Sequence, residues 1–187
     1  GKKSKMAASR TIFHAIGALL LLCLSAAAVG ARRVADSPKG LGGAIIAVAN
    51  LTGTPGASGR AVFNWYNERG SVNVTLKGSL TNITMSHIQW HNKTLGNPIM
   101  AGIIPRMVSW MPKMLDPPVS YTKSYTFNAT FDTRYLAMIT RGMTAKTFLS
   151  LLEQGNLVVI VYTTDQPWGA LQGPLICKAD CKSHTGY

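Results

Sequence analysis

Acidic residues are scarce in this chain, and histidine and cysteine are scarcer still. The 187 residues include seven Asp and Glu, four His and three Cys. The acids are isolated from one another along the sequence: Asp36, Glu68, Asp116, Asp132, Glu153, Asp165 and Asp180. Acid–base catalysis needs titratable groups that act together, and a redox metal site needs several imidazoles that converge. We therefore expect no catalytic residues, no bound metal and no cofactor.

Long apolar runs are also missing, except near the N-terminus. There a basic stretch at 2–10 precedes an apolar run at 16–28, and small residues follow. This order is typical of a signal peptide, which we predict over residues 1–31 with cleavage after Gly30 or Ala31. The alternative is an uncleaved signal anchor, but the run is short for a membrane span of about 20 residues. We expect a secreted, extracellular protein with no membrane span after cleavage.

Asparagine occurs more often in N-x-T triplets than chance would give. Five of the nine asparagines stand in such triplets, none with Pro in the middle: Asn50, Asn73, Asn82, Asn92 and Asn128. About one residue in six is Ser or Thr, so chance predicts only one or two. N-glycosylation requires entry into the secretory pathway, and the bulky polar glycan must face water. The triplets therefore agree with the leader and predict five surface positions.

Basic residues exceed acidic ones, even without the leader. Removing residues 1–31 leaves 187 − 31 = 156 residues, with fifteen Lys and Arg against seven acids, or 15 − 7 = +8. The basic residues are scattered, which favours an ordinary solvated surface. The alternative is loose attraction to an acidic polysaccharide. The secretory leader argues against nucleic acid as a partner.

Two cysteines remain after the leader. Cys177 and Cys181 form a C-x3-C pair, for which a disulfide is the default in an oxidising compartment. A zinc site that adds His184 and pairing with another chain are the alternatives.

Alternating apolar and polar residues dominate the rest of the chain and predict strands. At 71–80 and 125–131 the apolar positions alternate with polar ones, and Asn73 and Asn128 fall on the polar face. Further strands are predicted over 44–51, 60–66, 83–90, 156–163 and 168–175. One short helix is predicted after Thr144, with Phe148 and Leu152 on its apolar face and Gly155 as its stop. The pattern predicts an all-β antiparallel sandwich or barrel with one short crossover helix.

Two segments resemble the CHRD domain, a family named after chordin. They are Ser-His-Ile-Gln-Trp-His at 86–91 and the stretch 148–175, which runs from a helix through a Gly-Asn stop and an apolar strand to Pro-Trp-Gly. The matched motif positions are His87, Gln89, Tyr162, Thr163, Pro167, Gly169 and Gly173. The resemblance implies a Greek-key sandwich similar to copper-zinc superoxide dismutase. It predicts a linker over 32–43, a domain over 44–176 and a tail over 177–187 that holds the cysteine pair.

Departures from the family pattern bear on function. A family histidine falls on Gln89, a second falls on Tyr162, and the family Glu and Arg fall on Ala170 and Gln172. We expect the remaining His87 to be buried or half-buried and hydrogen-bonded to a neighbour. The resemblance therefore favours a non-catalytic module that binds an extracellular protein or an acidic polysaccharide. A superoxide-dismutase-like metal oxidoreductase is the alternative, as is a structural cell-wall glycoprotein.

One segment is longer than a compact sandwich needs. Between 100 and 118 the chain is rich in Met, Trp and Pro, and it either covers one end of the core or forms a partner surface. We predict as contact residues Met107, Trp110, Met111 and Trp168.

Overall fold

The computed structural model describes residues 44–107 and 113–181. The predicted signal peptide (1–31) and linker (32–43) lie outside these residues. So do Trp110, Met111 and His184.

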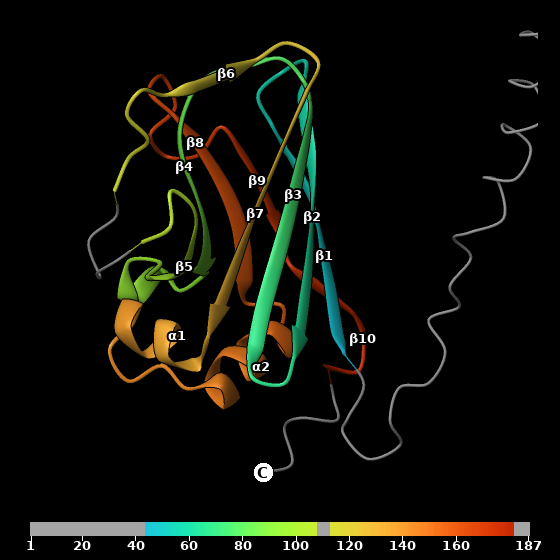
Figure 1. Cartoon of the computed structure of the whole chain (residues 1–187), viewed down its shortest axis with the longest axis vertical. Coiled ribbons are helices and arrows are strands. Elements are labelled where there is room, and N and C mark those ends of the chain that lie inside the picture. Colours follow the sequence, from blue (N-terminus) through green and yellow to red (C-terminus); the bar gives the residue numbers. More distant parts are fainter. Residues whose placement is uncertain (1–43, 108–112, 182–187) are drawn as a thin grey trace, which may run out of the picture. The chain divides into compact units, whose positions relative to one another are not determined.

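The described residues form an antiparallel β barrel of ten strands. Their bounds are β1 Ile45–Gly53, β2 Ala57–Tyr66, β3 Arg69–Gly78, β4 Leu80–Trp90, β5 Ile99–Ile104, β6 Val119–Tyr121, β7 Ser124–Asp132, β8 Leu157–Thr163, β9 Leu171–Pro174 and β10 Ile176–Ala179. The strand order is β5-β4-β8-β9-β1-β2-β3-β7, with β10 beside β1 and β6 beside β4. The edge strands β5 and β7 approach each other, so the barrel is nearly closed (Figure 1). The predicted all-β antiparallel fold is confirmed.

Two helices lie at one end of the barrel, and β6 lies at the other (Figure 1). They are α1, Thr133–Ile139, and α2, Ala145–Glu153; a short 3-10 turn, Lys93–Leu95, follows β4. The prediction of a single helix is wrong, because the described residues form two. Helix α1 was not predicted because it follows directly on β7, with no turn between them. Asp132, the last residue of β7, caps α1 by accepting a hydrogen bond of 2.8 Å from the Tyr135 amide.

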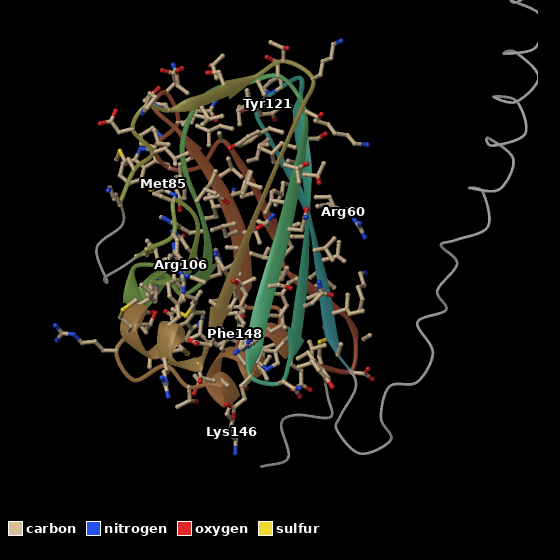
Figure 2. All side chains as sticks on the ribbon, viewed as in Figure 1. Arg60, Met85, Arg106, Tyr121, Lys146 and Phe148 are labelled. Carbon is tan, nitrogen blue, oxygen red and sulfur yellow. A yellow bond between two sulfur atoms is a disulfide. The ribbon has the colours of Figure 1, made fainter. Side chains whose placement is uncertain are left out.

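Helix α2 forms as predicted and closes the core. Thr144 accepts a hydrogen bond of 3.1 Å from the Thr147 amide, and Gly155 follows the helix in the left-handed region at φ 71°. Phe148 is fully buried, and its ring centroid lies 5.8 Å from that of Phe63 and 5.9 Å from that of Phe131. Phe148 lies at the helical end of the barrel and Tyr121 at the opposite end (Figure 2).

Three strands were not predicted. Strand β5 is buried along most of its length, so its sequence IMAGII has no alternation to reveal it. Strand β6 has only three residues. Strand β10 pairs with β1 through Cys177 and Ala179, so the predicted tail at 177–187 is wrong at its start, where the chain still belongs to the sheet. The predicted disulfide between Cys177 and Cys181 is present.

A close approach of β1 and β9 joins the two sides of the barrel. A Cβ on Gly173 would lie 2.0 Å from the carbonyl oxygen of Asn50, and one on Gly53 would lie 2.1 Å from that of Ala170. Any side chain there would push the strands apart. The motif position Gly173 is therefore explained by packing.

Candidate functional site

Three motif positions, His87 and Gln89 on β4 and Tyr162 on β8, lie next to one another on the outer face of the sheet. Directly opposed pairs are Gln89 with Val158, His87 with Ile160, and Met85 with Tyr162. Side chains of opposed residues share a face, so Gln89 and Tyr162 flank the His87–Ile160 pair. The Gln89 amide nitrogen donates a hydrogen bond of 2.5 Å to the Tyr162 hydroxyl. This hydrogen bond links β4 to β8 across the His87–Ile160 pair.

His87 is buried although it belongs to the outer face. It is 1% exposed, and its ring centroid lies 5.5 Å from that of Tyr162. Neither ring nitrogen has a hydrogen-bond partner among the described residues, so the predicted hydrogen bond to a neighbour is wrong. Burial lowers the pKa of His87 to about 4, which keeps the imidazole neutral at physiological pH. Burial also raises the pKa of Tyr162 to about 12, against the smaller opposing effect of the Gln89 hydrogen bond.

A hollow of about 380 Å³ lies over this part of the sheet. We name it the Trp168 hollow, and its lining residues are Gln89, Trp90, His91, Gly96, Asn97, Val158, Ile160, Tyr162, Pro167, Trp168 and Gln172. Gln172 lies opposite Ile160 on β9, so strands β4, β8 and β9 supply the floor. Trp168 stands at the hollow with 92% of its surface exposed. The predicted positions Gln89, Tyr162, Pro167 and Trp168 therefore meet at one site.

The turn that carries Trp168 is held at several points. The Gly169 amide donates to the Gln166 carbonyl at 3.2 Å, and the Gln166 amide donates to the Thr163 hydroxyl at 3.1 Å. The Thr54 hydroxyl donates to the Gln166 side-chain oxygen at 3.0 Å. Gly169 has φ 120°, which favours glycine. The motif positions Thr163 and Gly169 thus shape the turn that presents Trp168.

Sequence reasoning missed Trp90 and Asn97 at this hollow. Trp90 ends β4, and Asn97 lies in the connection to β5. The connection folds back, since the Trp90 amide donates to the Pro98 carbonyl at 3.0 Å. No local sequence pattern predicts that Trp90 and Asn97 line the same hollow, because this depends on how the connection crosses the sheet.

The other three predicted contact residues are Met107, Trp110 and Met111, and none of them is found on the described surface. Met107 is 1% exposed, and its Cγ lies 2.6 Å from where a Cβ on Gly102 would be. It fills the space that the glycine leaves and belongs to the core, so its prediction as a surface contact is wrong. Trp110 and Met111 fall outside the described residues.

The predicted glycosylation sites are mostly on the surface. Asn50, Asn73, Asn82 and Asn128 are exposed, whereas Asn92 is half-buried. The Asn92 side-chain oxygen accepts hydrogen bonds from the amides of Thr94 at 3.1 Å and Leu95 at 3.2 Å. Asn73 and Asn128 oppose each other directly on β3 and β7.

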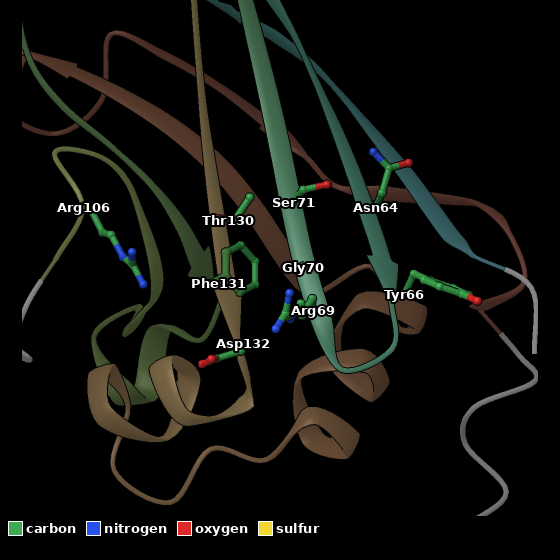
Figure 3. Close-up of a pocket in the computed structure, with 9 residues that line it drawn as sticks. All are labelled: Asn64, Tyr66, Arg69, Gly70, Ser71, Arg106, Thr130, Phe131 and Asp132. Atoms are coloured by element: carbon green, nitrogen blue, oxygen red, sulfur yellow. The ribbon is translucent and has the colours of Figure 1, made fainter. Parts of the chain in front are cut away.

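A second hollow, of about 470 Å³, contains two arginines (Figure 3). We name it the arginine hollow; its lining residues are Asn64, Tyr66, Arg69, Gly70, Ser71, Arg106, Thr130, Phe131 and Asp132. The Arg106 guanidinium lies 5.3 Å from the centre of the Tyr135 ring. The Asp132 carboxylate caps α1 and opposes Arg69 in the register of β3 and β7, so the lining holds two positive charges against one negative charge. The hollow therefore offers positive charge to a ligand.

Neither a metal cluster nor a spanning helix is found in the part of the chain that the structure describes. These residues contain no group of three or more His, Cys, Asp and Glu side chains that could hold a metal ion. They also contain no helix long and apolar enough to cross a membrane.

Comparisons with known proteins identify no relative. No protein-family model matches the chain, and neither does any curated protein or solved structure compared with it. The resemblance to the CHRD domain stays a prediction.

Proposed function

We propose that this chain is a secreted, N-glycosylated, CHRD-like module that binds an extracellular partner and does not catalyse a reaction. The secretory part of this proposal draws on the leader, on the excess of N-x-T triplets and on the disulfide between Cys177 and Cys181. Four of the five triplet asparagines are exposed, as glycan attachment requires.

The exposed indole of Trp168 carries the binding part of the proposal. A tryptophan with 92% of its surface in water leaves a large apolar ring uncovered. Tryptophan is also enriched among residues that dominate binding energy. The hydrogen bonds of its turn restrain the backbone, so little backbone entropy is lost when a partner covers the ring.

Affinity capture tests this proposal. The mature glycosylated protein is used to capture partners from the extracellular fraction, beside Trp168→Ala and a control, Met138→Ala. Met138 is a large apolar residue on α1, 44% exposed, and it lines neither the Trp168 hollow nor the arginine hollow. We expect Trp168→Ala to lose the captured partners and Met138→Ala to keep them. Equal capture by all three proteins would refute a role for Trp168.

Metal analysis tests the oxidoreductase alternative. His87 is buried and His91 is exposed, so the two imidazoles do not share one environment. We expect the purified mature protein to hold no stoichiometric copper or zinc. If the protein holds stoichiometric metal, and His87→Ala and His91→Ala each lose it, the oxidoreductase alternative would replace the binding proposal.

A second candidate function, binding of an acidic polysaccharide, rests on the arginine hollow. Arg69 and Arg106 would attract carboxylate or sulfate groups, beside the hydroxyls of Ser71 and Thr130. Retention on immobilised polygalacturonate should fall as salt rises, because exposed charges are screened. Retention that Arg69→Gln and Arg106→Gln leave unchanged would exclude this hollow.

A further inference from the structure

We propose that the Trp168 hollow binds a neutral saccharide, namely a chain of uncharged pyranose rings. This inference rests on the proposed binding function and names the chemistry of its ligand. It joins three properties of the lining: its lack of charge, its amide side chains and its aromatic rings.

The lining has none of the permanently charged side chains although the protein is strongly basic. The chain has a net charge of +12 with histidine counted as neutral, yet the described residues that line the Trp168 hollow include no Lys, Arg, Asp or Glu, and His91 is their one imidazole. A charged ligand would lose its hydration there without gaining an opposite charge. A neutral ligand avoids this cost, so the lining selects against acidic sugars, phosphates and charged peptides.

Amide side chains give the hollow both donors and acceptors. Gln89 reaches it from β4, Gln172 from β9 and Asn97 from the connection after β4. Each amide has an acceptor oxygen and a nitrogen with two donors, and a sugar hydroxyl likewise donates and accepts. Gln89 uses one donor on Tyr162, so its oxygen and second N–H remain for a ligand. The Asn97 side-chain oxygen is buried and has no hydrogen-bond partner in the described part of the chain, so we do not count it among the acceptors open to a ligand.

Aromatic rings give the hollow an apolar surface of the right kind. The face of an aromatic ring carries partial negative charge, which attracts the weakly positive C–H groups on the face of a pyranose ring. Trp168 supplies an open indole for such stacking, and Trp90 and Tyr162 border the same hollow. The held turn keeps the Trp168 backbone in position before a ligand arrives.

The size of the hollow fits a short piece of a glycan chain. Its volume of about 380 Å³ lies near the lower end of the range of about 300–1,000 Å³ for small-ligand sites. The same neutral rings occur in free polysaccharides and in the glycans of other glycoproteins. The chemistry is shared, so the experiment must separate the two sources.

Titration calorimetry with soluble oligosaccharides tests the proposal. The probes are oligomers of β-1,4-glucose, β-1,3-glucose and β-1,4-N-acetylglucosamine for polysaccharides, and a released oligomannose glycan for glycoproteins; oligogalacturonate is the acidic comparator. The proteins are the mature glycosylated wild type, Trp168→Ala, Trp168→Phe, Gln172→Ala and the control Met138→Ala. Thermal unfolding of each variant shows whether it is folded.

We expect at least one neutral probe to bind the wild type and oligogalacturonate not to bind the hollow. Trp168→Ala should weaken binding about tenfold or more, with Trp168→Phe recovering part of it, because the loss of a central aromatic contact commonly costs this much. Gln172→Ala should weaken binding by a smaller factor, and Met138→Ala should not change it. Which probe binds identifies the source of the glycan.

Two results would overturn this inference. The first is that no neutral probe binds; the second is that Trp168→Ala binds as well as the wild type. If the capture experiment nevertheless still depends on Trp168, the binding function stands and the saccharide is excluded as its ligand. If neither experiment depends on Trp168, the proposed function fails as well.

Discussion

Acid should destabilise this protein through one buried histidine. His87 is 1% exposed, and burial lowers its pKa from the ordinary 6.5 to about 4. The unfolded chain therefore binds a proton to this imidazole at a higher pH than the folded chain does. Its contribution to stability is present above about pH 6.5 and is lost as the pH falls towards 4.

The magnitude follows from these two pKa values. Between about pH 8 and pH 5, His87 takes up a proton in the unfolded chain, where its pKa is 6.5, and this proton binding stabilises the unfolded state. In the folded protein His87 stays almost entirely neutral over the same range, so the folded state gains almost nothing. The difference is about 2 kcal/mol at pH 5, and it approaches about 3 kcal/mol below the folded pKa. A loss of this size is a large fraction of the stability of a typical domain, which is about 5–15 kcal/mol.

Urea unfolding at several pH values measures this effect. The wild type is compared with His87→Leu, which removes the titrating group, and with His91→Gln, which removes an exposed imidazole just after the same strand. We expect the wild type to lose about 2 kcal/mol more than His87→Leu between about pH 8 and pH 5. His91→Gln should follow the wild type.

Carboxylates begin to titrate at the acid end of this range, which is why the comparison uses the difference between proteins. His87→Leu should also be well tolerated at neutral pH, because the ring nitrogens of His87 have no partners among the described residues to leave unpaired. Equal pH dependence in the wild type and His87→Leu would refute the reasoning, since it would mean that His87 is solvated or paired.

Three further predictions concern stability and are measured by urea or thermal unfolding. Phe148→Ala should cost about 3–5 kcal/mol because it empties the centre of an aromatic cluster, whereas exposed Lys146→Ala on the same helix should change little; similar losses in both would contradict this packing. Gly173→Ala should destabilise the barrel by about 1–3 kcal/mol or more, because its Cβ would lie 2.0 Å from a backbone oxygen; wild-type stability would show that β1 and β9 are not so close. Reducing the disulfide between Cys177 and Cys181 should cost about 2 kcal/mol or less, because it closes a short loop; complete unfolding would mean that it does more than hold β10.

Predictable features of this fold are those with a local physical cause. Strands β3 and β7 alternate strictly, and the exposed Asn73 and Asn128 fall on their polar faces, so period and solvation agree. Helix α2 has its cap, its apolar face and its glycine stop within twelve residues, from Thr144 to Gly155. Strand β5 was not predicted because it is buried on both faces and so shows no alternation. Helix α1 was not predicted because it continues directly from strand β7.

The sequence by itself determined the alternation of apolar and polar faces, and hence an antiparallel β fold. It also determined where the N-x-T triplets fall on that pattern and which two cysteines could pair in the domain. Only the tertiary structure decided which side chains meet. It brought Gln89, Tyr162 and Trp168 to one hollow and buried Met107 against Gly102. The physical reason is that hydrophobic period and turn chemistry are local, whereas the pairing of β4, β8 and β9 joins residues far apart in the chain.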